Sequence, residues 1–164
     1  KDYKILINDE VSQIDQIREY LLPIKFSTLT EDIKKNIISK KKAIEHVNSN
    51  GILITFPSGE VATSSLIFNE ANERRWKPLI GSIINKTNAT IIPVRFFGKN
   101  SLLFHTIGFV NNNLRRILFI RELLNKKNQT FKLSIGKKIS SLQNERLNNR
   151  QIVDKLRSIV VNIN

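Results

Sequence analysis

The sequence predicts an α/β domain with a mainly parallel central sheet flanked by helices. Short apolar runs typical of buried strands, at residues 52–56 and 90–97, alternate with stretches in which apolar residues recur at helical spacing. The 164 residues suit one ordinary domain, and 40% of them are hydrophobic, which is a globular composition. No internal repeat or low-complexity linker interrupts the chain, so a single domain is expected over residues 1–164.

The chain begins with a predicted strand, helix and strand. Residues 3–7 form the first short apolar run. Apolar residues at helical spacing then predict a helix over residues 11–21, which ends before Pro23 because the residue preceding a proline disfavours helical geometry. Residues 23–26 predict a second short strand.

A longer helix and a buried strand follow. Thr30 is the expected N-cap of this helix, and Asn50-Gly51 is its expected end. The run at residues 52–56 is apolar almost without alternation, which indicates a strand buried on both faces. One face of the helix is predicted to carry Ile33, Ile37, Ile44 and Val47.

The second half continues the alternation. Helices are predicted over residues 78–87, 101–110 and 113–126, and strands over residues 90–97 and 130–135. The last helix has the clearest period, with one face formed by Ile152, Leu156, Ile159, Val160 and Ile163. In parallel sheets, sites form where strand ends meet loops at the carboxyl edge. The segments after Phe56 and after Phe97 are therefore expected to carry function.

Composition narrows the classes of function. The absence of cysteine excludes disulfides, thiolate metal sites and a cysteine nucleophile. No run approaches the roughly 20 apolar residues of a spanning helix, so any membrane contact by this portion is expected to be peripheral. The net charge is +13, and residues 111–164 alone carry twelve Lys/Arg against three Asp/Glu. Such a surplus of positive charge favours an anionic partner. Nucleic acid, anionic lipid headgroups and an acidic carrier protein are the three alternatives.

Most familiar catalytic patterns are absent. The segment from Gly81 to Thr87 lacks the spacing of a phosphate-binding loop. His46 and His105 are the two histidines; we expect the first on a solvated helix and the second packed among apolar residues. Two histidines without clustered carboxylates do not predict a metal site, and no cofactor is indicated.

The turn Phe56-Pro57-Ser58-Gly59-Glu60-Val61 directly follows a predicted buried strand. Pro57 ends the hydrogen-bonded ladder, and Gly59 permits either a positive φ or a close backbone approach. Glu60 is then placed at the carboxyl edge of the sheet. Such a turn is either an ordinary loop or part of a binding site, and the residues around it decide between the two.

Those residues occur as ordered blocks. Trp76 precedes a predicted helix, and Ile92-Pro93-Val94 lies in a predicted strand. Further blocks are Gly98-Lys99-Asn100-Ser101-Leu102-Leu103-Phe104, Leu114-Arg115, Arg121-Glu122-Leu123-Leu124-Asn125-Lys126 and Ser134-Ile135-Gly136. With the turn, these blocks over residues 4–140 resemble the glycerolipid acyltransferase superfamily of the 1-acylglycerol-phosphate acyltransferase type. They are most similar to its bacterial hemolysin-named branch, which includes acyltransferases that complete ornithine and glycine lipids and in which the turn reads Phe-Pro-Ala-Gly-Glu-Val.

The resemblance also shows what the chain lacks. The superfamily signature is His-x-x-x-x-Asp. In it, the His is the general base on the acceptor hydroxyl, and the Asp orients the imidazole of that His. Gly51 and Val110 stand five residues after the two histidines, so neither fits. In the family the signature precedes the strand that residues 4–7 resemble, and position 1 is not Met. The catalytic His and Asp are therefore expected upstream of Lys1, and this chain alone is expected to be inactive.

The resemblance implies an acyltransferase that moves a fatty acyl group from acyl carrier protein or coenzyme A to a lyso-lipid hydroxyl, peripherally on the inner face of the membrane. Because Glu60 is acidic and Val61 replaces the superfamily arginine, a zwitterionic or amino-containing acceptor is favoured over a bare phosphate. The expected substrate-binding residues are Pro57, Ser58, Gly59, Glu60, Val61, Arg95, Asn100 and Ser101. The expected contacts to the anionic membrane surface or the acyl carrier protein are Arg115, Arg116, Arg121, Lys126 and Lys127.

Two other classes of protein stay open. One is a non-catalytic relative that binds lipid or a partner protein. The other is a basic nucleic-acid-binding domain. Against the latter, the aromatic residues lie mostly in apolar runs and are not interleaved with Lys and Arg as a base-stacking platform requires.

Overall fold

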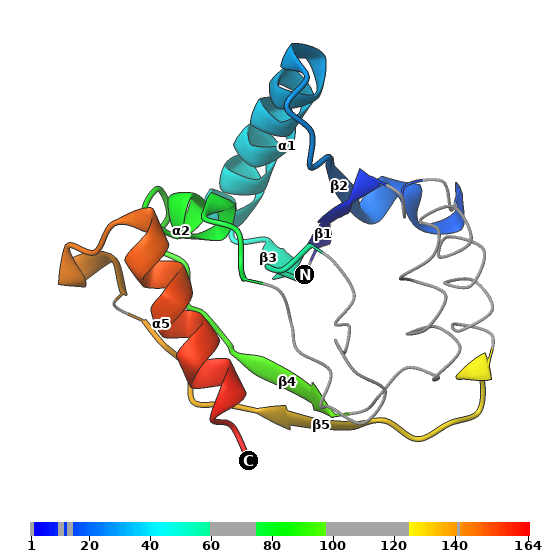
Figure 1. Ribbon diagram of the computed structural model, residues 1–164, viewed down its shortest axis with the longest axis vertical. Coiled ribbons are helices and arrows are strands. Elements are labelled where there is room, and N and C mark those ends of the chain that lie inside the picture. The colour runs from blue at the N-terminus through cyan, green and yellow to red at the C-terminus, as the bar shows by residue number, and fades with distance from the viewer. Residues whose placement is uncertain (1, 10–11, 13–14, 60–74, 98–124, 141) are drawn as a thin grey trace.

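The computed structural model describes residues 2–9, 12, 15–59, 75–97, 125–140 and 142–164. Its centre is a three-stranded parallel sheet in the order β2-β1-β3, formed by β1 (Tyr3–Asn8), β2 (Leu21–Ile24) and β3 (Ile52–Thr55) (Figure 1). β1 is the middle strand and pairs in parallel with both neighbours. The predicted α/β class with a parallel sheet flanked by helices is therefore confirmed.

Three α-helices accompany the sheet in the described residues. α1 (Thr30–Asn48) packs on β2 and β3, whereas α2 (Leu79–Ile84) packs against α5 (Asn149–Val161) (Figure 1). Two short 3-10 helices, η2 (Asp15–Tyr20) and η3 (Leu142–Glu145), also lie within the described ranges. None of these helices combines the length and the apolar content that crossing a membrane requires.

The core joins the inner side of the sheet to the helices. Burial of apolar surface is the main favourable term in folding. Here one buried cluster contains residues of β1 and β2 together with residues of α5. The buried cluster comprises Leu6, Leu22, Ile24, Ala43, Trp76, Ile80, Ile83, Ile84, Leu142, Ile152, Val153 and Leu156. Ile152 and Leu156 of the predicted face of the last helix lie in this cluster, which confirms its period.

The second pair of strands is antiparallel. β4 (Val94–Phe97) pairs with β5 (Lys132–Ile135), and an isolated bridge joins Ile91 to Ile139. The predicted strand at residues 90–97 is thus regular only in its second half. α5 contacts β4 and lies along this pair of strands (Figure 1).

Two local predictions were wrong near the start of the chain. From Asp15 to Tyr20, the helix predicted over residues 11–21 is the 3-10 helix η2 instead, and β2 begins at Leu21 rather than at Pro23. Leu21 and Leu22 are 7% and 6% exposed and pair with β1. Sheet pairing and burial therefore outweigh the helical spacing of the apolar residues in this segment.

The N-terminal half of α1 also differs from the prediction. Its N-cap is Leu29, without a side-chain hydrogen bond, and Thr30 is the first helical residue. Ile33 and Ile37 of the predicted apolar face are 46% and 60% exposed. Polar tethers fix this end of the helix instead. The Ser39 hydroxyl donates to the Pro23 carbonyl at 2.7 Å, and buried Asp32 pairs with Lys25.

The predicted end of α1 at Asn50-Gly51 is confirmed. Asn50 adopts a φ of 63°, and the Gly51 amide donates to the His46 carbonyl at 2.9 Å. Asparagine tolerates the left-handed region better than most residues. The helices predicted over residues 101–110 and 113–126 lie outside the described residues, apart from the end of the second.

Candidate functional site

The carboxyl ends of the three parallel strands meet at one edge of the sheet. β1 ends at Asn8, Phe26 follows β2 by two residues, and the turn at Pro57–Gly59 follows β3. The Asn8 amide nitrogen Nδ2 donates to the Gly59 carbonyl at 3.4 Å. We call Asn8, Phe26, residues 57–59 and Lys77, which is described below, the carboxyl-edge cluster.

Gly59 meets both conditions that the sequence suggested for it. Its φ is 69°, a conformation that strongly favours glycine. A Cβ at this position would overlap the Phe26 ring. Its amide donates to the Phe56 carbonyl at 2.9 Å, which closes the turn. Ser58, predicted to bind substrate, is only 2% exposed. The described part of the turn thus offers backbone and ring surface, with its serine turned inward.

Lys77 lies in this cluster, and the sequence did not predict it. Its backbone amide donates to the Pro57 carbonyl at 2.9 Å. Its ammonium Nζ lies over the Phe26 ring, 5.1 Å from the ring centroid, which is within the range of a cation–π interaction. The sequence held only a weak signal, a lysine between the sole tryptophan and the proline at the start of α2.

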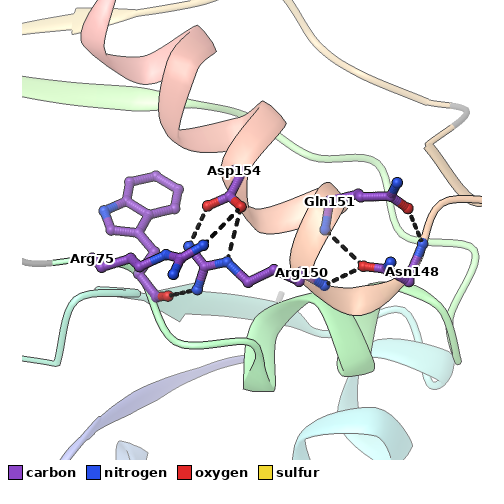
Figure 2. Close-up of polar contacts among 6 residues, drawn as sticks. Arg75, Asn148, Arg150, Gln151 and Asp154 are labelled. Atoms are coloured by element: carbon purple, nitrogen blue, oxygen red, sulfur yellow. Dashed lines mark hydrogen bonds and ion pairs between the residues drawn. The ribbon is translucent and has the colours of Figure 1, made fainter.

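The segment that carries Lys77 is anchored by α5 (Figure 2). Arg150 Nη1 donates to the Trp76 carbonyl at 2.6 Å, and the same guanidinium pairs with Asp154. Arg75 reaches Asp154 from the other side at 3.5 Å. The Trp76 side chain is buried in the core at 6% exposure. The hydrogen bond from Arg150, followed by Coulomb attraction to the arginines, holds the pKa of Asp154 below its usual range.

A capping box fixes the start of α5. The Asn148 side chain accepts from the Gln151 amide at 2.9 Å, and the Gln151 side chain accepts from the Asn148 amide at 2.9 Å (Figure 2). Two backbone donors of the first turn are thereby satisfied. Arg150 in this first turn is therefore well placed to reach Trp76.

Arg95, the one arginine predicted to bind substrate, has structural contacts. Arg95 Nη1 donates to the carbonyls of Val161 and Ile163 at 2.5 and 3.0 Å, at the C-terminal end of α5. Its guanidinium also lies over the Phe97 ring at 4.8 Å from the centroid. A cation at this end of a helix offsets the negative end of the helix dipole. The substrate-binding role of Arg95 stays a prediction.

The remaining predicted residues are not brought together in the described structure. Lys127 is exposed and Lys126 half-buried in the turn before β5. The other predicted site residues lie outside the described residues, namely Glu60, Val61, Asn100, Ser101, Arg115, Arg116 and Arg121.

His46 lies at the opposite, amino edge of the sheet. Its Nε2 is 3.2 Å from the Ile52 carbonyl, and a Cβ at Gly51 would overlap its ring. The ring therefore packs the turn between α1 and β3. Beside it is a shallow groove of about 330 Å³, lined by Lys4, Glu19, Leu21, Leu22, Lys42, Glu45 and His46. His105 lies outside the described residues. Within the described ranges, no three His, Asp or Glu side chains form a metal-binding group.

The described part of the carboxyl-edge cluster contains no histidine that could act as a base. It combines a cation, an aromatic ring and a turn held by hydrogen bonds.

The chain is similar to a curated protein whose activity is named. The chain is 24% identical over 143 residues to the lyso-glycine lipid O-acyltransferase of Phocaeicola vulgatus. The alignment covers 83% of the chain and 48% of that protein, so the chain spans about half the length of the curated relative it matches. Neither a family model nor a solved structure matches the chain. The similarity supports a relationship to acyltransferases.

Proposed function

We propose that the natural protein containing this chain transfers a fatty acyl group to the hydroxyl of a lyso-lipid. The observation that carries the proposal is the 143-residue similarity to a lipid O-acyltransferase. The carboxyl-edge cluster supports it, because that cluster contains residues 57–59 of the turn Phe56–Val61, which we call the motif turn. The proposed donor is an acyl thioester of acyl carrier protein or coenzyme A. The first acceptor to test is a lyso-glycine lipid, the acceptor class in the relative's name.

The test is an acyl-transfer assay with the full-length protein. Both donors are offered with lyso-lipids that differ only in headgroup, and the products are identified by mass spectrometry. We expect an O-acylated product from at least one acceptor and none from the matching lipid that lacks the hydroxyl. No product from any pair of donor and acceptor would overturn the proposal. Lipid binding without transfer would then indicate a non-catalytic relative.

We further propose that the protein works at the inner membrane surface as a peripheral protein. The net charge of +13 supports attraction to anionic lipid. Flotation with vesicles that contain anionic lipid, compared with neutral vesicles, tests this step. We expect binding to the anionic vesicles alone, and its loss at high salt. Equal binding to both, or a salt-sensitive shift of heterogeneous DNA without any flotation, would contradict the membrane proposal.

A further inference from the structure

We propose that Lys77 binds an oxyanion, a carboxylate or phosphate, in the headgroup of the lipid acceptor. The inference rests on the proposed function and adds a residue that determines the choice of acceptor. The Lys77 ammonium lies at the carboxyl edge, over the Phe26 ring and one backbone hydrogen bond away from Pro57. A headgroup held there would lie beside the motif turn.

A second lysine at the same edge shows what is special about Lys77. Lys25 Nζ lies 3.3 Å from the Oδ1 atom of Asp32, so its charge is balanced within the protein. Among the described residues, no carboxylate pairs with Lys77. A cation–π contact orients an ammonium but does not neutralise it, and a lysine has three N–H donors. Within the part of the chain that the structure describes, Lys77 is therefore a positive charge held beside an aromatic ring and balanced by no carboxylate.

The backbone on both sides of this lysine is fixed. The Lys77 amide is bound to the Pro57 carbonyl, and the carbonyl of Trp76 is bound to Arg150. The Phe26 ring in turn lies against Gly59, where a side chain would collide with it. A group that is already positioned loses less conformational freedom when a ligand binds. Lys77 is accordingly better suited to selecting a ligand than a mobile surface lysine would be.

This inference changes the expected acceptor. The acidic Glu60 favoured a zwitterionic or amino-containing headgroup. Lys77 adds a requirement for a negative group on the same headgroup. A zwitterionic or purely anionic acceptor meets that requirement, whereas a purely cationic one does not.

The experiment compares two acceptors in the full-length protein, a lyso-glycine lipid with a free carboxylate and the same lipid as its carboxamide. The KM for each acceptor and kcat are measured for the wild type and for Lys77→Gln, Lys77→Arg and Lys86→Gln. Lys86 follows α2, is exposed, and lies roughly 13 Å along the helix direction from Lys77. Lys86→Gln is therefore a matched control for the loss of one positive charge.

We expect the wild type to prefer the carboxylate by about tenfold to a hundredfold in KM, as for a hydrogen bond to a charged group. Lys77→Gln should remove this preference with little change in kcat, Lys77→Arg should keep most of it, and Lys86→Gln should leave it intact. A preference that survives in Lys77→Gln would overturn the inference. So would a rise confined to the KM of the acyl donor, which would place the contact on the phosphodiester of its phosphopantetheine.

A binding measurement keeps this inference separate from the proposed function. Calorimetric titration uses the carboxylate and carboxamide lipids without the acceptor hydroxyl, so no reaction is needed. If the protein transfers no acyl group but binds the carboxylate in a manner that depends on Lys77, the proposed function fails and the inference stands. Equal affinities of the wild type and Lys77→Gln for the carboxylate lipid would overturn it. Thermal midpoints of all variants confirm that they are folded.

Discussion

The polar side chains at the two edges of the parallel sheet have different kinds of contact partner. At the amino edge, Lys4 Nζ donates to the Glu19 carbonyl at 2.8 Å, and His46 packs against Gly51 and contacts the Ile52 carbonyl. Both side chains therefore have partners within the protein. At the carboxyl edge, Lys77 meets an aromatic ring and no described carboxylate. The charge that we propose to bind the acceptor therefore lies at the carboxyl edge, whereas Lys4 and His46 at the amino edge contact backbone carbonyls.

The largest effect is expected from Gly59→Ala at the carboxyl edge. The new Cβ collides with Phe26 in a backbone conformation that disfavours alanine, so we expect a loss of about 3 kcal/mol in unfolding free energy. Urea denaturation measures it. Asn50→Ala is the matched control, because its φ is also positive and only the strain of about 1 kcal/mol applies. Equal losses in the two variants would contradict the contact with Phe26.

A smaller effect is expected from Gly51→Ala at the amino edge. The added methyl group collides with the flexible His46 ring, which moves aside at a cost of about 1 kcal/mol. In a His46→Ala background the same substitution should be nearly neutral, and a double-mutant cycle measures this coupling. Acyl transfer should be unchanged in both backgrounds. A loss of transfer in His46→Ala that is not explained by stability would give the amino edge a catalytic role.

The third effect is a change in stability that is expected only at acidic pH. It concerns Asp32, which tethers the start of α1 near the carboxyl edge. A hydrogen bond with Ser27, and then Lys25, lower the pKa of Asp32 below its ordinary value of 3.8. A lowered folded-state pKa adds stability above the unfolded-state value, and that stability is lost as the pH falls below it. Urea midpoints at several pH values should therefore show the wild type losing its advantage over Asp32→Asn below about pH 4. A difference that is independent of pH would contradict the lowered pKa.

The smallest effect is expected from Lys41→Gln, near the amino edge. The Lys41–Glu45 ion pair is exposed and spans 3.8 Å, so its removal should change the unfolding free energy by less than about 0.5 kcal/mol. The proposed acceptor preference of the protein should not change, in contrast to Lys77→Gln. A changed preference would show that overall charge, rather than the position of Lys77, selects the acceptor.

Features that depend on local backbone chemistry were predictable from the sequence. The end of α1 at Asn50-Gly51 and the tight turn at Gly59 follow from residues that tolerate positive φ, and both were found. The face of α1 was not predictable, because the tethers of Asp32 and Ser39 reach across to the end of β2. Lys77 was missed for the same reason. Its position depends on residues about 20 and 50 positions earlier in the chain and on α5 far downstream.

The hydrogen bond from Arg150 to the Trp76 carbonyl has a consequence for synthesis in the cell. It joins residues 74 positions apart, so the segment before Lys77 gains this anchor only after α5 has been made. A nascent chain that ends before residue 149 would contain β1, β2, β3 and the motif turn but not this anchor. Contacts between distant residues form late because closing a long loop is costly in entropy. The backbone beside Lys77 therefore gains this anchor only after Arg150 has been made, when all three strands of the parallel sheet are already present.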